Sequence, residues 1–422
     1  MTDTYRYRVA CKSEDCSWFL LARPVEASSI WKIRQLSNTH TCLLPNHGGN
    51  SSLTAEFLAH KILDQVRSQP DIKPSNLHKD LLATHGLHIP YKRVYQAKEH
   101  ALKLINGTHE ESYANIPKYC EELRAANPGT IIDYEATAIS NQFSRLFLCF
   151  HASAQGFTNC KPLIGIDGTH VKSKFKGILL AATATDAQGQ LFPLAFAVVD
   201  SENDAQWLWF LQKLRDVLME HVPTILDVPD ALTILSDRQK GLIQGVESIF
   251  PFSAHGYCVK HLERNLKIHH NHPELIKLLW KAASARSIPE FEKHMDNFRK
   301  ISEHAYTWLI NETNPENWVD CYFKGKRYGH YTSNIIESLN SWLRTAREQP
   351  LLPMLETIRS GLMDWFEKRR IEGQTFQANG FVPKVILNIM NHLLTILGYE
   401  TNFKVDDRRS PISLQTSSGW YV

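Results

Sequence analysis

Residues 161–200 read KPLIGIDGTHVKSKFKGILLAATATDAQGQLFPLAFAVVD and decide the fold class of this chain. The stretch holds three apolar runs of strand length. Between the second and the third run, DAQGQ at 186–190 predicts a tight turn. We therefore expect three consecutive strands that fold back on one another as a meander.

The residues that follow alternate between helical and extended patterns. The expected elements are an amphipathic helix over 204–218, a buried strand over 231–237, a helix over 238–250 and a short strand over 253–258. Together with the meander, these elements follow one another in an order typical of one compact α/β unit. A mostly helical stretch follows Lys267, and two strong helical patterns follow Ser333.

Three carboxylates occupy notable positions in this region. Asp167 ends the first expected strand, where Gly168 lets the chain turn away; Asp237 ends a later strand, and Glu337 lies on an expected helix. Carboxylate clusters suit Mg²⁺ or Mn²⁺, which can promote phosphoryl transfer. A single Asp at a strand end is more often a turn or cap residue, so the residues alone leave both interpretations open.

The composition limits the classes of protein to consider. The chain has 422 residues, enough for several domains, and 47 Lys and Arg against 44 Asp and Glu give a net charge of +3. These values are typical of globular proteins, and they argue against a surface that is basic all over. Residues 1–110 hold 14 Lys and Arg against 10 Asp and Glu, so the basic excess lies at the N-terminal end.

The sequence has no apolar run of about eighteen residues and no apolar core of a signal peptide near its start. We therefore expect a soluble intracellular protein with no membrane contact. Its eight cysteines are too scattered for a disulfide scaffold, but three of them lie within the first 42 residues.

Residues 5–43 contain short β-like runs that predict a small antiparallel sheet, too small to be held together by its apolar core. The pattern Cys11-x4-Cys16-x23-His40-x-Cys42 supplies four ligands for a structural Zn²⁺, which would close the site to catalytic water. The alternative is two cysteines and an unrelated His-x-Cys pair. A polar, glycine-rich linker follows at 43–52.

Three short amphipathic helices are expected next, over 53–69, 73–86 and 91–105. They could form a DNA-reading unit of helix-turn-helix type. Three-helix packing is also the commonest way to fill a segment of this length, so the pattern leaves both interpretations open.

A further pair, Cys258-x2-His261, is expected on one face of a helix start. It could organise an active site, or Cys258 could be a buried thiol at a strand end. Several cations are candidates for phosphate contacts. They are Arg6, Arg8, Lys32 and Arg34 in the N-terminal strands, and Arg238 and Lys240 next to Asp237.

The order of these motifs resembles a known family. The segments 167–214, 232–267 and 327–350 look like the catalytic domain of Mutator-like element (MULE) transposases. The N-terminal Cys and His spacing resembles the zinc finger of those transposases and of WRKY-type plant regulators. The resemblance covers roughly residues 1–400. It implies a ribonuclease-H-like α/β fold with a helical insertion and a catalytic triad of Asp167, Asp237 and Glu337.

The resemblance also implies an activity. The chain would be a DNA transposase of the Asp-Asp-Glu (DDE) type in the nucleus, with Mg²⁺ or Mn²⁺ at the triad and Zn²⁺ in the finger. Its partners would be double-stranded DNA, as terminal inverted repeats and target, and possible further copies of itself. The alternatives are a domesticated DNA-binding regulator and a shortened, inactive transposase, because many relatives carry a C-terminal zinc knuckle and no cysteine follows Cys321 here.

Four parts of the chain are expected on these grounds. They are a zinc finger over 1–46, a helical domain over 53–130, a catalytic domain over 155–350 with its insertion at about 268–332, and a helical C-terminal tail over 351–422.

The expected zinc site predicts how much zinc the purified protein contains. Purified protein should hold about one zinc per chain, because four soft and borderline ligands bind Zn²⁺ tightly. Replacing Cys11 by Ser should lower that content, and elemental analysis measures it. A zinc-free wild-type chain would refute the finger.

Overall fold

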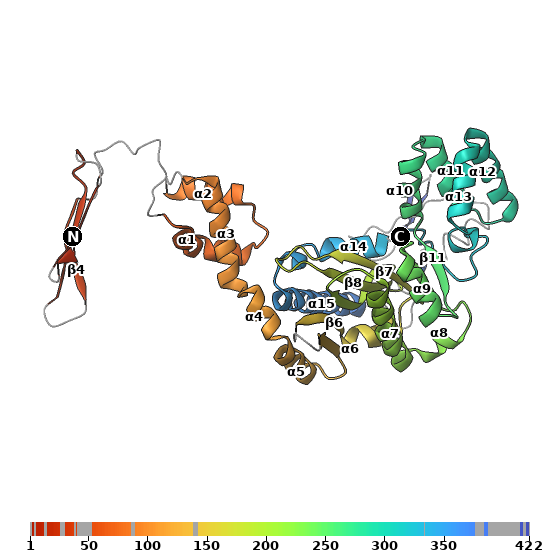
Figure 1. Cartoon of the computed structure of the whole chain (residues 1–422), viewed down its shortest axis with the longest axis horizontal. Coiled ribbons are helices and arrows are strands. Elements are labelled where there is room, and N and C mark those ends of the chain that lie inside the picture. The colour runs from red at the N-terminus through yellow and green to blue at the C-terminus, as the bar shows by residue number, and fades with distance from the viewer. Residues whose placement is uncertain are drawn as a thin grey trace. The chain divides into compact units, whose positions relative to one another are not determined.

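The computed structural model describes residues 2–3, 6–11, 15–25, 30–37, 39, 53–85, 89–137, 142–332, 334–375, 384–386, 414–416 and 419–421. The chain divides into two compact units, Met1–Ile105 and Asn106–Val422 (Figure 1). In the described ranges, no helix has the length and apolar character needed to span a membrane.

The first unit contains a small antiparallel sheet and three helices. Its elements are β1 (Thr2–Asp3), β2 (Arg6–Ala10), β3 (Phe19–Pro24), β4 (Trp31–Ser37), α1 (Ala55–Ser68), α2 (Pro74–His85) and α3 (Tyr91–Asn106). The strands pair in chain order, as expected. Ala22 is the one buried apolar side chain in the described part of the sheet. The helices have a core of their own, centred on Leu58, Ile62, Leu77 and Val94.

The second unit is built on a mixed sheet of seven strands in the order β11-β10-β7-β8-β9-β6-β5. The strands are β5 (Ile131–Ala136), β6 (Phe143–Cys149), β7 (Leu163–His170), β8 (Ile178–Thr185), β9 (Leu191–Val199), β10 (Thr233–Ser236) and β11 (Ala254–Tyr257). Strands β7, β8 and β9 form the expected antiparallel meander, and Asp186 and Gln190 pair across the turn between the last two. Strands β10 and β11 run parallel to β7.

Helices of this unit both cover the sheet and extend from it. They are α4 (His109–Ala114), α5 (Ile116–Ala126), α6 (His151–Phe157), α7 (Asp204–His221), α8 (Pro223–Asp227), α9 (Lys240–Ile249), α10 (Val259–His269), α11 (Pro273–Ala283), α12 (Ile288–Ile301), α13 (Glu303–Glu312), α14 (Asn334–Trp342) and α15 (Leu351–Gln374). Two short 3₁₀ turns, Pro315–Asn317 and Ala346–Glu348, and a hairpin of β12 (Leu414–Thr416) and β13 (Gly419–Tyr421) complete the described elements.

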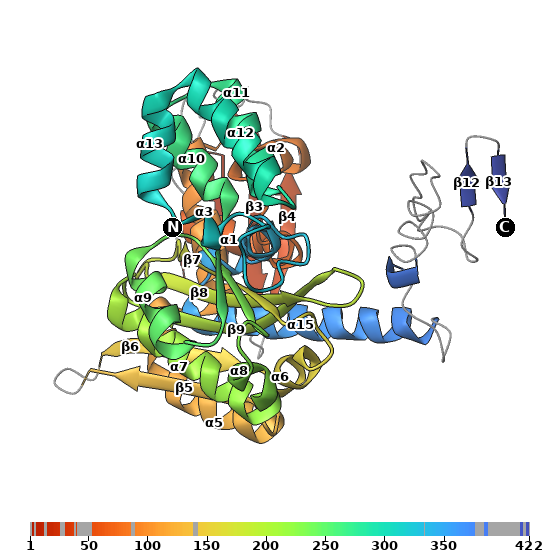
Figure 2. The same cartoon turned by 90° about the vertical axis from the view of Figure 1, so that its right-hand side faces the viewer.

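Helices α10–α13 form a body with its own apolar core, in which Trp318 and Phe298 are fully buried. Figure 2 shows these helices gathered beyond one end of the sheet. The chain enters and leaves this body at one place, where the Val259 amide donates to the Tyr331 carbonyl at 2.9 Å. The body is the helical insertion that the sequence predicts between Asp237 and Glu337.

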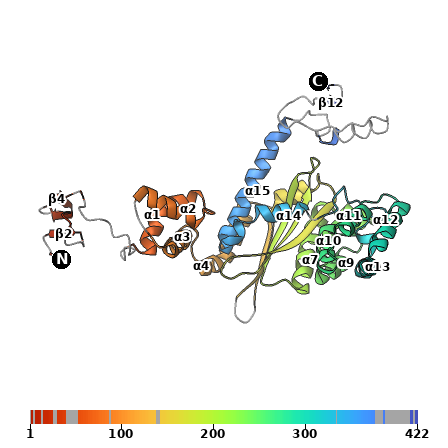
Figure 3. The same cartoon turned by 90° about the horizontal axis from the view of Figure 1, so that it is seen from above.

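The sheet is the middle of three layers (Figure 3). Side chains of α6, α7, α8 and α9 pack on one face, and side chains of α5, α14 and α15 pack on the other. All positions of β8 are buried, so its side chains alternate between the two apolar layers. This double burial explains why residues 178–182 are all apolar, and the two threonines that follow, Thr183 and Thr185, are buried as well.

The unit boundaries differ from the expected ones at two places. The sheet includes β5 and β6, which lie before the expected start of the catalytic domain at residue 155, and α5 packs on β5. Helix α15 is not a separate tail in its first turns, because Leu355 and Ile358 are buried against the sheet. Both differences arise because the edge strands and the second helical layer are needed to close the core.

The hairpin between β7 and β8 predicts a stability effect. Gly177 has a φ of +102°, and a Cβ there would lie 2.7 Å from the Val199 carbonyl oxygen. Gly177→Ala should therefore lower the free energy of unfolding by about 1–3 kcal/mol. Gly373→Ala is the matched control, because no atom lies within 4 Å of its added Cβ on α15. Urea unfolding measures both, and equal effects would contradict the strain at Gly177.

Candidate active site

The carboxyl ends of two parallel strands meet at one edge of the sheet. Ser236 of β10 is in register with Tyr257 of β11, so Asp237 and Cys258 follow the strands side by side. The Cys258 amide donates to the Ser236 carbonyl at 2.9 Å and ties the two chains together. The prediction that Asp237 ends a strand is thus confirmed.

Asp167 lies within β7, and the expectation that it ends the strand is wrong. The strand continues to His170, and Asp167 pairs with Ala181 of β8. Gly168 does not make a turn here; an added Cβ would lie 3.3 Å from side-chain atoms of Ile178 and Leu180 on β8 and 3.4 Å from the Trp207 ring. The glycine therefore lies where side chains of β8 and α7 pack closely on the strand.

Helix α14 packs across β7, β8 and β9 and brings a polar side chain to Asp167. The Asn340 side-chain amide donates to Asp167 Oδ2 at 2.9 Å. Asn340 is a residue that the sequence reasoning missed, although it lies one turn after Glu337 on the same helix face. Glu337 is exposed, on a helix whose apolar side is buried as predicted.

Electrostatics link Asp167 to its neighbours. Burial, and next the negative charge of Asp237, raise the pKa of Asp167 to about 6. His261 and the hydrogen bond from Asn340 act in the opposite direction. Because Asp237 and His261 both act on Asp167, the structure brings these three predicted residues into one environment.

Cys258 and His261 form a pair at the start of α10. Cys258 is buried at the N-cap position, and a hydrogen bond with its side chain raises the pKa of His261. The charges of Asp237 and Asp167 raise the pKa of His261 as well. His261 Nδ1 is buried without a hydrogen-bond partner. The pair therefore lies beside the two carboxylates, as an organising role requires.

The donor chemistry suits a hard cation. Two carboxylates share one environment, and Asn340 Oδ1 is buried with no hydrogen-bond partner. In the described ranges, however, no group of three or more His, Cys, Asp or Glu side chains has a geometry that could hold a metal ion. Glu337 is thus not gathered with Asp167 and Asp237 into a set of ligands.

The two cations next to Asp237 have different surroundings. Arg238 donates to the Glu312 carbonyl at 2.5 Å and pairs with its carboxylate at 3.3 Å, so it joins the sheet edge to α13. Lys240 is exposed at the first turn of α9. Arg238 therefore has a structural partner, while Lys240 remains accessible to a phosphate.

The predicted finger residues lie in the first unit. Arg6 and Arg8 are exposed on β2, and Lys32 and Arg34 are exposed on β4. Cys11 and Cys16 are half-buried in the connection between β2 and β3. The other two expected zinc ligands, at positions 40 and 42, lie outside the described residues. The zinc site stays a prediction.

Comparison with known proteins finds similarities to transposases, and the family match lies within the second unit. Residues 163–265 match the family model of the MULE transposase domain. The match runs from β7 to α10, so it includes Asp167, Asp237 and the Cys258–His261 pair, and it stops before α14.

A curated relative points the same way. The transposase for insertion sequence element IS905 of Lactococcus lactis subsp. lactis (strain IL1403) is 24% identical over 213 residues, which are 48% of this chain and 52% of the relative. The chain thus matches about half the length of that protein. These two similarities support a transposase function.

A solved structure, the Mos1 mariner paired end complex with Mn, aligns with 63% of this chain and 96% of its own. The identity is 12% and the TM-score is 0.16, so no argument about the fold rests on it.

The raised pKa of Asp167 predicts a pH effect on stability in metal-free buffer. A carboxyl whose pKa is higher in the folded state than its ordinary 3.8 contributes stability below that value, and the contribution is lost as the pH rises through about 6. Asp167→Asn removes the titration. Relative to this variant, the wild type should lose up to about 3 kcal/mol between pH 4 and 7.

Urea unfolding at a series of pH values with a chelator present measures this difference. A difference between the two proteins that stays constant with pH would contradict the shared environment of Asp167 and Asp237.

Proposed function

We propose that this chain is a DNA transposase of the DDE type, with Asp167, Asp237 and Glu337 as its catalytic carboxylates. The observation that carries the proposal is the placing of Asp167 and Asp237 on neighbouring strands, within electrostatic reach of each other. The MULE match over both residues supports the same assignment.

The strand order supports a ribonuclease-H-like core. The meander β7-β8-β9 is antiparallel, and β10 and β11 add in parallel on the other side of β7. Helices cover both faces, and α14 returns to the central strands after the helical insertion. A carboxylate on α14 is therefore carried to the same part of the sheet as Asp167.

A divalent cation fits this site by donor chemistry, with Asp167 and Asp237 as its first ligands and Glu337 as the third. Bound Mg²⁺ or Mn²⁺ would activate a nucleophile and stabilise the charge on the leaving oxygen. A cation would also offset the repulsion from Asp237 that, after burial, raises the pKa of Asp167.

The residues around the carboxylates have positioning roles in this proposal. Asn340 holds the Asp167 carboxylate from α14 at 2.9 Å, and it ties the helix that carries Glu337 to β7. His261, oriented by Cys258, places a second polar group beside both aspartates. Removal of such supporting groups typically lowers activity about 10–100-fold.

The proposed reaction has two steps at phosphodiester bonds of DNA. Water attacks the phosphorus at an element end and the bond from phosphorus to the 3′ oxygen breaks, so the element strand keeps a free 3′-hydroxyl and the flanking strand leaves with a 5′-phosphate. That hydroxyl then attacks a phosphodiester of the target in line, so no covalent enzyme intermediate is needed. Exposed cations lie on β2 and β4 of the small sheet that a zinc ion would hold together. They would contact the same DNA.

One observation favours a second candidate, a transposase-derived DNA-binding regulator. Glu337 is exposed and, in the ranges that the structure covers, no third ligand joins the two aspartates. In a regulator the carboxylates would have no catalytic role, and DNA binding would suffice for function.

The two candidates predict different behaviour with Mn²⁺. The transposase should nick a labelled duplex that carries the terminal repeat, and Asp167→Asn should reduce nicking by more than about 100-fold, beyond the range for loss of a supporting group. Glu337→Gln should have the same effect. Gel electrophoresis of the labelled strand measures the rate.

Asp216→Asn is the matched control, because Asp216 is an exposed carboxylate on α7 bonded to Gln212. It should nick as fast as the wild type. Equal nicking by the Asp167 variant would remove the triad assignment, and a wild type that binds the repeat without nicking it would favour the regulator.

A further inference from the structure

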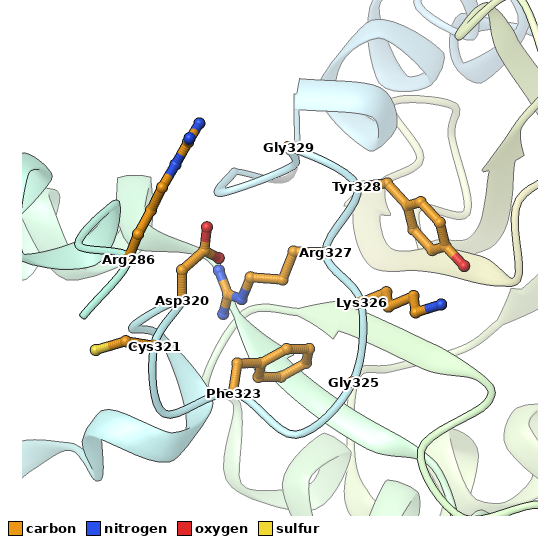
Figure 4. A pocket seen from close by; sticks show the side chains of 9 residues that line it. All are labelled: Arg286, Asp320, Cys321, Phe323, Gly325, Lys326, Arg327, Tyr328 and Gly329. Atoms are coloured by element: carbon orange, nitrogen blue, oxygen red, sulfur yellow. The ribbon is translucent and has the colours of Figure 1, made fainter. Parts of the chain in front are cut away.

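A pocket of about 430 Å³ lies at the loop that follows the last helix of the insertion, within the range of about 300–1,000 Å³ typical of small-ligand sites. Figure 4 shows it. Its lining comes from this loop and from the connection between α11 and α12. The residues are Arg286, Asp320, Cys321, Phe323, Gly325, Lys326, Arg327, Tyr328 and Gly329.

Arg327 is the buried charge in this pocket. Its side chain is 4% exposed, and in Figure 4 it extends between Asp320 and Phe323, while Lys326 and Tyr328 project to the other side of the loop. Nη2 donates to the Tyr257 carbonyl at 3.3 Å and to the Asn317 carbonyl. Nε and Nη1 have no hydrogen-bond partner.

The Arg327 guanidinium stacks on the Phe323 ring, with Cζ 4.7 Å from the ring centre. Its burial is still costly, because each buried donor without an acceptor loses its hydration. Burial lowers the pKa of Arg327 to about 10. No ion pair joins Arg327 to a carboxylate in the described part of the chain, and the nearby Asp320 carboxylate accepts from the Tyr331 hydroxyl. Two of the guanidinium nitrogens, on different sides of the group, therefore lack the acceptor that a guanidinium prefers.

The lining has an excess of positive charge. Arg286 and Arg327 are opposed by one carboxylate, that of Asp320. On the other side of the loop, to which Lys326 projects, Lys161 Nζ is 5.8 Å from the Tyr328 ring centre. Burial, and next the charge of Lys384, lower the pKa of Lys161. Cations that repel one another in this way favour a polyanion.

The position of the pocket suggests which anion binds. Arg327 is bonded to the carbonyl of Tyr257, and Tyr257 is in register with Ser236, the residue before Asp237. Neighbouring strands are about 4.8 Å apart. The guanidinium is therefore anchored one strand away from a proposed catalytic carboxylate, at a distance that a DNA backbone can bridge.

We infer that the Arg327 pocket binds one phosphate of the DNA backbone, with the Arg327 guanidinium as the buried cation of the site. The inference rests on the proposed DNA-cutting function and adds a substrate contact on the insertion side of the site. The contact reads no base, so it would act on any sequence.

The test compares the full chain with Arg327→Gln in a chelator, so that DNA is bound and not cut. Arg299→Gln is the matched control, because it removes an exposed arginine of the same insertion, paired with Glu303 on its surface. The probe is a labelled duplex of arbitrary sequence, and anisotropy measures its affinity over about 50–200 mM salt.

Arg327→Gln should bind about tenfold more weakly, and the slope of log affinity against log salt should be shallower by about 0.9, the value for one phosphate contact. Arg299→Gln should bind as the wild type does. Arg327→Lys keeps the charge and loses the planar guanidinium, so it should weaken DNA binding while the slope of log affinity against log salt stays the same. This variant carries the test if Arg327→Gln does not fold.

Inorganic phosphate is the second arm. It should raise the thermal unfolding temperature of the wild type and not that of Arg327→Gln, because a bound anion stabilises the folded state. Stabilisation by phosphate with unchanged DNA binding would overturn the DNA backbone as the source and assign the pocket to a small phosphate-bearing molecule. No effect in either arm would overturn the anion site.

The outcome is separable from that of the proposed function. A wild type that binds DNA as Arg327→Gln does, yet nicks it with Mn²⁺, would overturn only the pocket. A wild type that does not bind DNA would overturn both the function and the DNA phosphate.

Discussion

Strand β8 is buried at every position, and its side chains alternate between two apolar layers. Leu180 and Ala182 pack under α7, and Leu179 and Ala181 pack under α14 and α15. A strand of this kind can be stable only when helices cover both of its faces. On the second face, the covering helices α14 and α15 belong to a part of the chain that follows the helical insertion. This requirement returns α14 to β7 and so brings Asn340 to Asp167.

Much of this arrangement could be predicted from the sequence, because the period of the apolar residues is strong. The meander, the helices after it and the strand before Asp237 follow from patterns in continuous segments. The position of Asp167 inside β7 could not be predicted, because Gly168 looks like a turn residue until the side chains of Ile178, Leu180 and Trp207 around it are known. Packing between segments that are distant in the sequence decides whether such a position requires glycine.

The site was predictable to a similar extent. Asp237, Cys258 and His261 were found from local spacing, and they lie together because parallel strands end at one edge. Asn340 was missed because an amide on a helix has no local signature, and only its bond to Asp167 gives it a role. Arg327 was missed for the same reason: a buried arginine and an exposed one look alike in a sequence.

A backbone hydrogen bond from Val259 to Tyr331 closes the base of the helical insertion. Because the chain departs from the sheet and returns to it at one point, the insertion is a side branch in topology, with its own core. Its length can change during evolution without moving the strands on either side. The number of residues between Asp237 and Glu337 is therefore a poor guide to relatedness, while the sequence at the two junctions is a good one.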